Sequence, residues 1–316
     1  MPAVQRLRWW VLLLIGTFFV PMIAHAQRIP SLTIIHTYEA DNAILNVHFR
    51  NLEQGRVGLI SLEGGTISEA QISAFGQNTT AFAAEGIYYA FISVPLDQAI
   101  RTYEAQAQIE YTDGEEETIT FPLNVISGGF IQQPVSLPGA DETLFNPETE
   151  ANELAYIFEV ADPVTPDALW GETGFVAPTD REFTSPFGAV RVFNDTYNTL
   201  HTGWDYGASI GESMTALASG RVAFAGPLPI RGNYVLIDHG WGLYTGYAHL
   251  SVTFVTQGQM IAPGQIIGRV GSTGRSSSAH AHIEMIANGN WVDVADFLAL
   301  YLPDRDAEAT ATPEDE

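Results

Sequence analysis

The chain has 316 residues, which is long enough for two domains that each bury a core of their own. Its formal net charge of −24 argues against nucleic acid and anionic lipid as partners, because both repel an acidic surface. It contains neither cysteine nor lysine, which excludes disulfides, thiolate-bound metal, a phosphate-loop lysine and a lysine that carries a cofactor.

Residues 1–26 have the pattern of a secretory signal peptide. Two arginines precede an apolar run from Trp9, and Ala24-His25-Ala26 forms a small-x-small cleavage site. We therefore expect cleavage before Gln27 and a mature protein outside the cytoplasmic membrane, either secreted or in the cell envelope. The same residues would also permit an uncleaved membrane anchor. No second apolar run approaches membrane-spanning length, so no membrane contact is expected after cleavage.

Residues 27–126 are predicted to form an immunoglobulin-like β-sandwich. Six short segments are rich in β-branched and aromatic residues, and turn residues separate them. Asp113-Gly114, between two of these segments, is a hairpin signal. This density of short strands is typical of two packed antiparallel sheets. His36 and His48 have no spaced partners here and are interpreted as ordinary strand residues.

Residues 127–174 are predicted to be a linker that contains a short helix. The linker begins with a Gly- and Pro-rich stretch, "SGGFIQQPVSLPGADE". Asn146 then offers an N-cap and Pro147 a first helical residue, with acidic residues in the first turn. Leu154, Ile157 and Phe158 would form the apolar stripe of this helix.

Residues 175–302 are predicted to form a second β domain. Strand patterns continue from Phe175 to about Leu302, with glycines at nearly every turn. The tail at 303–316 is acidic and lacks apolar periodicity, so it is predicted to be disordered.

Five of the eight histidines fall between His201 and His282. His201 and Asp205 form an H-x-x-x-D pair, and both side chains are ordinary zinc ligands. His280 and His282 form an H-x-H pair, in which alternate residues of one strand share a face. His249 lies alone between the two groups.

Each of these fragments by itself would fit an ordinary surface or core histidine. Together, a His/Asp pair and an H-x-H pair in one domain resemble a catalytic zinc site with three ligands and an open position for water. Spacing alone leaves open which imidazoles bind the ion, because both rings of the H-x-H pair could reach it.

The segment from Phe183 to Leu298 resembles the lysostaphin-type, or LytM-domain, zinc endopeptidases, which cut peptide bonds in bacterial peptidoglycan. Several motifs carry this resemblance in the family's order: "TSPFGAVR", "HTGWD", "ASGRVAFAG", "GNYVLIDHGWGLYTGYAHLS", "VTQGQMIAPGQIIGRVGSTGRSS" and "AHAHIE".

The resemblance implies a small antiparallel β fold whose groove holds one zinc ion per chain. It gives His201, Asp205 and His282 as the zinc ligands, and His249 and His280 as catalytic residues that do not bind the metal. It also implies the peptides of peptidoglycan as the substrate.

The motifs depart from the family in places. Ser278-Ala279 stands where a Gly-Pro is common, and Tyr197 is only a candidate for a tyrosine that the family has before its first ligand. His239 matches the family pattern outside the ligand set and is expected to be structural. Glu284 has two open interpretations: an acceptor that orients a histidine ring, or a surface carboxylate.

Two other functions compete with that of an endopeptidase. A catalytically inactive LytM-type protein with a regulatory or wall-binding role is the alternative, although such relatives characteristically lack ligands that are all present here. A biotinyl- or lipoyl-type carrier is excluded because there is no lysine to modify. The sequence predicts no oligomeric state.

Overall fold

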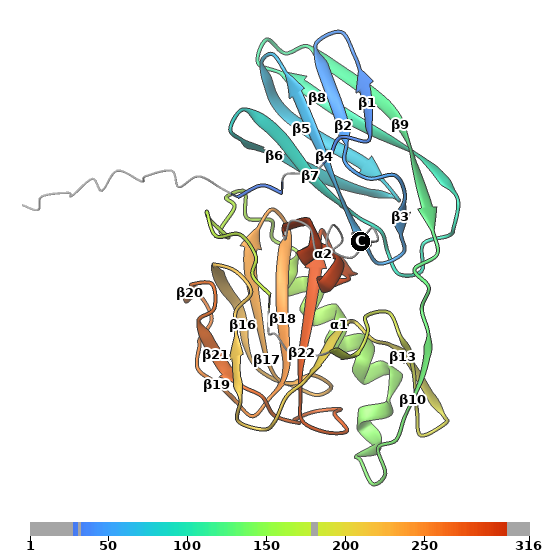
Figure 1. Cartoon of the computed structure of the whole chain (residues 1–316), viewed down its shortest axis with the longest axis vertical. Helices are drawn as coiled ribbons and strands as arrows, with labels where there is room; N and C mark the ends of the chain where they lie inside the picture. Colours follow the sequence, from blue (N-terminus) through green and yellow to red (C-terminus); the bar gives the residue numbers. More distant parts are fainter. Residues whose placement is uncertain (1–27, 31–32, 178–182, 302–316) are drawn as a thin grey trace, which may run out of the picture.

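The computed structural model describes residues 28–30, 33–177 and 183–301. The predicted signal peptide (1–26) and acidic tail (303–316) lie outside these residues. Of the helices described, none is both long and apolar enough to cross a membrane. The described chain is mainly β, as predicted, and forms two β units joined by a linker that carries a helix (Figure 1).

The N-terminal β unit consists of strands that follow one another along a single sheet path. Their bounds are β1 (His36–Glu39), β2 (Ala43–Val47), β3 (Leu52–Glu53), β4 (Val57–Gly64), β5 (Ile67–Ala74), β6 (Gln77–Ala84), β7 (Ile87–Ser93), β8 (Thr102–Tyr111) and β9 (Glu116–Ile126). The order is β1-β2-β4-β7-β6-β5-β8-β9-β3, and the short β3 joins β9 in parallel. The predicted hairpin at Asp113-Gly114 is confirmed, because it connects the paired strands β8 and β9.

This sheet curls over itself around one apolar core. Tyr38 of β1 and Phe121 of β9 lie far apart along the sheet path, yet their ring centroids are only 5.7 Å apart. Inward-facing residues such as Leu45, Ile72 and Ile109 are almost fully buried between the layers. The β character of this unit is confirmed, and its immunoglobulin-like topology stays a prediction.

The linker carries a strand and two helices, β10 (Gln132–Val135), the 3₁₀ helix η1 (Glu142–Phe145) and α1 (Pro147–Ala161). The predicted cap of α1 is confirmed, since the Asn146 side chain accepts from the backbone of Glu148 at 2.8 Å. Ile157 and Ala161 turn inward and pack on the second β unit.

The second β unit is built on an eight-stranded sheet of order β11-β14-β22-β18-β17-β16-β20, with β23 paired to β22. Two small sheets, β10-β12-β13 and β15-β21-β19, flank it. The bounds are β11 (Phe183–Ser185), β12 (Val190–Phe193), β13 (Tyr197–Leu200), β14 (Gly203–Gly207), β15 (Ser213–Thr215), β16 (Gly220–Leu228), β17 (Gly232–Gly240), β18 (Leu243–Leu250), β19 (Val252–Thr253), β20 (Met260–Ile261), β21 (Ile266–Arg269), β22 (His280–Ala287), β23 (Asn290–Val292) and α2 (Val294–Tyr301).

Helix α2 corrects the sequence analysis, which expected only strands up to Leu302. Asp293 caps this helix, because its Oδ1 accepts from the backbone of Ala295 at 2.9 Å and of Asp296 at 3.2 Å. The apolar run that follows is too short for periodicity to separate a helix from a strand.

The two faces of the central sheet have different partners. Along β22, alternate residues point to opposite sides, so His280, His282 and Glu284 share the face of Ile286. That face is covered by α1 near Ile286. The opposite face, which includes Ile283, belongs to the largest apolar core.

This largest core continues into the N-terminal unit. Phe82 stacks on Trp241 with ring centroids 5.5 Å apart, and Phe91 lies 5.7 Å from Phe297 of α2 by the same measure. Ser93 of β7 donates to the carbonyl of Ala287 at 2.8 Å, at the end of β22. The N-terminal unit therefore packs on the α2 end of the central sheet, as Figure 1 shows.

Candidate metal centre

Three of the predicted site residues meet on two neighbouring strands. Asp205 of β14 lies directly opposite His282 of β22, and His201 stands two residues before β14. Their potential ligand atoms all lie within 4.8 Å of one another, and all three side chains are buried. The fold therefore brings together the three residues that the resemblance gave as ligands.

Hydrogen bonds on the outer side of each ring decide which nitrogen faces the centre. His201 Nδ1 lies 2.7 Å from the carbonyl oxygen of Pro186, which can only accept, so Nδ1 carries the proton and Nε2 a lone pair. His282 Nε2 lies 3.2 Å from a carboxylate oxygen of Glu284, which leaves the lone pair on Nδ1. These two lone-pair nitrogens face each other at 3.2 Å, and Asp205 Oδ1 lies 3.1 and 2.7 Å from them.

Three lone pairs at such distances repel one another unless a cation or a proton lies between them. Two imidazole nitrogens and one carboxylate oxygen are also a donor set that catalytic zinc sites use, with a fourth position left for water. The residues therefore fit a zinc ion, and His201, Asp205 and His282 could bind one.

Local electrostatics keep two of these residues in the protonation state of a ligand. Burial lowers the pKa of His201 to about 4, although the negative charge of Asp205 acts in the opposite direction. Burial opposes ionisation of Asp205, but His201 and the other histidines hold its pKa well below the usual value. Burial also opposes charge on His282, yet its bonds to Asp205 and Glu284 raise its pKa, because two carboxylates favour a positive charge there.

The two predicted catalytic histidines lie beside this group, with their own ring centroids 5.0 Å apart. His249 Nδ1 donates to the carbonyl of Thr273 at 2.7 Å, and His280 Nδ1 to that of Ser278 at 2.8 Å. Both rings therefore keep a lone pair on Nε2. His280 Nε2 is buried without a hydrogen-bond partner and lies 3.3 Å from Asp205 Oδ1.

His249 is held in its neutral form beside the site. Burial, followed by the nearby charges of His282 and His280, holds the pKa of His249 well below its usual value, so the ring is neutral at pH 7. His249, His280 and His282 form a second group of donors within 4.8 Å of one another. The fold thus assembles all five predicted residues in one place.

Glu284 is the acceptor that orients His282, and its interpretation as a surface carboxylate is wrong. Its side chain is fully buried and accepts from Thr202 and from Tyr234, the latter at 2.9 Å. Burial raises the cost of its charge, but the adjacent Arg231 holds its pKa well below the usual value. A carboxylate behind a ligating histidine fixes the ring and raises its basicity.

Arg191 is a site residue that sequence reasoning missed. It stands on β12, donates to Asp205 Oδ2 and also to Ser185 Oγ at 2.9 Å. It thus binds one carboxylate oxygen and leaves Oδ1 facing the histidines. Arg191 ends the motif "TSPFGAVR", but nothing in the spacing of that motif marks it as a partner of Asp205.

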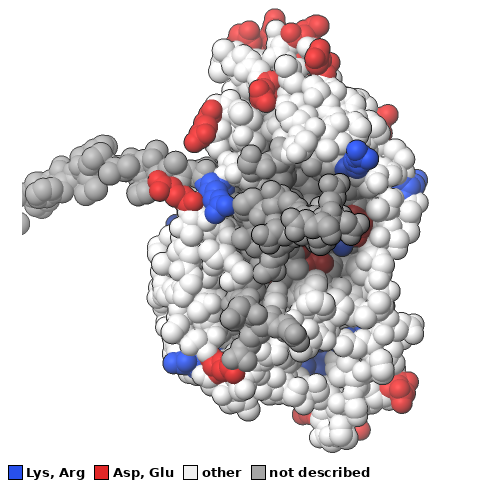
Figure 2. Space-filling model, in the orientation of Figure 1, with Lys and Arg blue, Asp and Glu red and all other residues white. Residues whose placement is uncertain are grey.

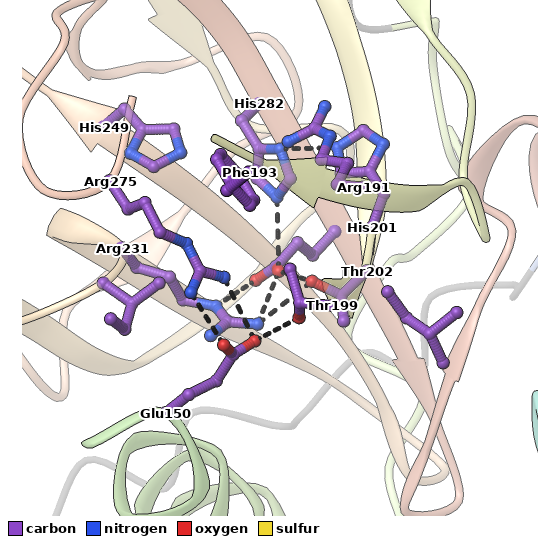
Figure 3. Close-up of a pocket in the computed structure, with 13 residues that line it drawn as sticks. Glu150, Arg191, Phe193, Thr199, His201, Thr202, Arg231, His249, Arg275 and His282 are labelled. Atoms are coloured by element: carbon purple, nitrogen blue, oxygen red, sulfur yellow. Dashed lines mark hydrogen bonds and ion pairs between the residues drawn. The ribbon is translucent and has the colours of Figure 1, made fainter. Parts of the chain in front are cut away.

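Two hollows flank the centre, and the linker contributes to both. One is lined by His201, His249, His282 and Glu150 of α1, and the other by His280 and Gln133 of β10. In Figure 3, Glu150 points from α1 toward Arg275 and Thr199, with the histidines across the hollow.

The hydroxyl of Tyr197 donates to Glu150 Oε2 of helix α1 at 2.5 Å. Its role as the family's tyrosine stays a prediction. His239, expected to be structural, lies fully buried between Ser219 and Thr245 and makes no contact with the ligand set.

Comparison with known proteins identifies the family of this domain. The model of Peptidase family M23 matches residues 199–294. Over 111 residues the chain is 43% identical to the DD-carboxypeptidase/endopeptidase Mpg of Neisseria meningitidis serogroup B, which covers 35% of this chain and 25% of that protein. Over 93 residues it is 40% identical to the peptidoglycan DD-endopeptidase ShyA of Vibrio cholerae, covering 29% and 22%.

A longer but more distant match is to the murein hydrolase activator NlpD of Salmonella typhimurium, 27% identical over 249 residues, or 78% of this chain and 58% of that protein. Among solved structures, a putative peptidase M23 from Pseudomonas aeruginosa superposes with a TM-score of 0.59 at 22% identity, covering 80% of this chain and 96% of that one. The chain spans about a quarter of the length of Mpg and ShyA.

Proposed function

Residues 199–294 form a domain of peptidase family M23, and we propose that this chain is a zinc-dependent endopeptidase that hydrolyses peptide bonds in bacterial peptidoglycan. The observation that carries the proposal is the convergence of three potential ligand atoms, one each from His201, Asp205 and His282. Such a set is complete for a catalytic zinc site and one ligand short of a closed structural site.

In this mechanism His201, Asp205 and His282 hold the metal, one ion per chain. Bound zinc would supply a Lewis acid that polarises the scissile carbonyl and makes water more acidic. Arg191 and Glu284 would keep the carboxylate and the ring of His282 oriented toward the ion.

His249 and His280 would handle the protons of the reaction. Each has a backbone carbonyl on Nδ1, so each offers Nε2 as a base toward the centre. One can take the proton of the attacking water and return it to the leaving amine, and the protonated ring can donate to the developing oxyanion.

The proposal also covers the domain boundaries and the location of the mature protein. We take residues 27–126 as an immunoglobulin-like sandwich, 127–174 as the linker and 175–302 as the peptidase domain. A signal peptide at 1–26 would place the mature protein outside the cytoplasmic membrane, where the proposed substrate lies.

The alternative function is that of a regulatory protein without catalysis. The long match to the activator NlpD favours it. The five polar site residues form two adjoining donor groups that share His282. They favour the enzyme, because regulation by binding requires no such donor set.

Two variants test the division of labour among the histidines. His282→Ala should lose both zinc and hydrolysis, since it removes a ligand. His280→Ala should keep its zinc and its fold but lose activity by about 10²–10⁴-fold, the range for a positioned acid or base. Metal content and peptide release from peptidoglycan are measured side by side. Loss of zinc from His280→Ala as complete as from His282→Ala would contradict the proposed roles.

A further inference from the structure

Helix α1 lies outside the segment that matches the M23 family, yet one of its carboxylates is connected to the proposed metal centre through two other side chains. Glu153 is 4% exposed, although glutamate is rarely buried without a partner. Its Oε1 lies 3.0 Å from Nη1 of Arg231, the residue just before β17, which is itself 5% exposed. A buried ion pair of this kind needs a role, because burying two charges is costly.

The ion pair continues without a break to a proposed zinc ligand. The guanidinium of Arg231 binds Glu284 with two parallel bonds, Nε to Oε2 at 2.8 Å and Nη2 to Oε1 at 2.7 Å. Glu284 Oε1 in turn lies 3.2 Å from Nε2 of His282. One buried network of ion pairs therefore connects Glu153, Arg231, Glu284 and His282. We call it the carboxylate–arginine network.

A second connection runs from Glu153 through the backbone to His249. The Glu153 carboxylate accepts from the backbone of Ile230 at 2.5 Å and of Arg231 at 3.1 Å. The carbonyl of Arg231 then accepts from the backbone of His249 at 2.8 Å. His249 needs such support, because its φ of +58° lies in the left-handed region that residues with a side chain rarely adopt.

We propose that Glu153 is a positioning residue for the M23 site, holding His282 through Arg231 and Glu284 and holding His249 through the backbone of Arg231. The inference rests on the proposed zinc site. It makes α1 a part of the catalytic unit even though the family segment begins at residue 199.

The charges of Arg231 and the two glutamates explain how Glu153 affects His282. With Glu153 ionised, Arg231 divides its hydrogen bonds between two carboxylates, and Glu284 keeps negative charge for the Nε2 proton of His282. Without the charge of Glu153, Arg231 is neutralised by Glu284 alone. That weakens the pull of Glu284 on the ring, and His282 becomes a poorer donor toward a metal.

The simplest alternative is that Glu153 only attaches helix α1 to the rest of the domain. Glu150, one turn earlier on α1, provides the comparison, because it pairs with Arg275 at 2.7 Å and accepts from Thr199 and Tyr197. It is anchored at least as firmly as Glu153, but none of its partners contacts a proposed ligand. If anchoring is all that matters, Glu150→Gln and Glu153→Gln should act alike.

The experiment measures zinc affinity by competition with a chelator, without peptidoglycan, in the full chain and its variants. Glu153→Gln should bind zinc about 10–100-fold more weakly, the usual cost of losing an outer partner of a ligand. The zinc affinity of Glu150→Gln should stay within about twofold of the parent, which is about 0.4 kcal/mol of binding free energy. The visible spectrum of the cobalt(II)-loaded protein should shift in Glu153→Gln and not in Glu150→Gln, since only Glu153 is connected to a proposed ligand.

A double variant distinguishes an effect transmitted through the carboxylate–arginine network from general destabilisation of the protein. If Glu153 acts through Glu284, then Glu153→Gln added to Glu284→Gln should cost no further zinc affinity, whereas independent effects would add. If Glu153→Gln does not fold, Glu153→Asp replaces it; the shorter side chain should reach either the backbone or Arg231, so zinc affinity should fall by about 10-fold, the lower limit for an altered outer partner of a ligand.

Equal zinc affinity in the parent and the Glu153 variant would overturn this inference and leave the proposed activity intact. A parent that binds zinc but never cleaves peptidoglycan would overturn the activity and leave the inference standing. A parent that binds no zinc would overturn both.

Discussion

At the scale of single residues, backbone carbonyls decide what the histidines can do. The Nδ1 protons of His201, His249 and His280 are each fixed by a carbonyl oxygen, while His282 is fixed by a carboxylate and presents Nδ1 instead. The spacing H-x-x-x-D and H-x-H identified these candidates. It could not assign the tautomers, because the spacing does not show that the carbonyls of Pro186, Thr273 and Ser278 face the rings in the folded chain.

His239 behaves differently, and its titration should be visible in stability. Burial lowers its pKa to about 4, whereas the unfolded chain has about 6.5, so below pH 6.5 the unfolded state binds a proton that the folded state does not. Its contribution is therefore complete above pH 6.5 and is lost as the pH falls toward 4. We expect this residue to cost about 2 kcal/mol between pH 7 and pH 5, at 1.36 kcal/mol per unit.

Urea unfolding at both pH values, on the parent and on His239→Gln, checks this expectation. The glutamine does not titrate, so its unfolding free energy should fall less between pH 7 and pH 5 than that of the parent. The other titrating groups are common to both proteins and cancel in the difference. An identical pH dependence for the two proteins would show that His239 does not titrate in this window.

At the scale of elements, the pairing of β14 with β22 sets the geometry of the ligands. Gly203 at the start of β14 sits so close to β22 that an added Cβ would lie 2.3 Å from the carbonyl oxygen of Ile283 and 2.9 Å from Nε2 of His282. The glycine of "HTGWD" is thus a requirement of close approach between two strands, which explains its place between the ligands His201 and Asp205.

Gly203→Ala should therefore separate the two strands and disturb the centre. A displacement of about 1 Å can cost about 10²-fold in activity, and we expect that loss together with weaker zinc binding. Gly65→Ala is the matched control, because a Cβ there meets nothing within 4 Å. Chelator competition and peptide release give the two readouts. Parent-like values for Gly203→Ala would mean that the strand spacing is more tolerant than its contacts suggest.

Some elements could be predicted from sequence and others could not, for identifiable reasons. The helix α1 was predictable from Asn146, Pro147 and its apolar stripe. Strands β5 and β6 were missed because "ISEAQISA" and "QNTTAFAA" consist largely of small and polar residues with little β propensity.

The site was predictable only where its residues follow local spacing. The five histidine and aspartate candidates fall in short motifs, and the fold brings them together. Arg191 and Glu153 are separated from their partners by 14 and 78 residues, and no spacing rule connects such positions. Their roles follow from packing, which the sequence alone does not express.

At the scale of the whole molecule, the N-terminal unit and the linker play different parts. The N-terminal unit contacts β22 at Ala287, and His280 begins that strand about 23 Å away at the rise of an extended chain. The linker, in contrast, lines both hollows beside the histidines through Gln133 and Glu150. We expect substrate preference to depend on the linker more than on the N-terminal unit.

The surface charge fits the same division. Acidic side chains gather at the tip of the N-terminal unit, far from the second β unit, as Figure 2 shows. Three of the arginines, Arg191, Arg231 and Arg275, instead line the hollow at the centre. Each is paired with a carboxylate, so the centre is a network of compensated charges inside an acidic protein.

The most direct test of the proposed endopeptidase activity is mass spectrometry of purified peptidoglycan after incubation with the full chain. The zinc-loaded protein should release fragments with newly cut peptide ends, and removal of zinc by a chelator or the substitution His282→Ala should abolish them. A folded, zinc-loaded protein that leaves peptidoglycan uncut would contradict the account and favour the regulatory alternative.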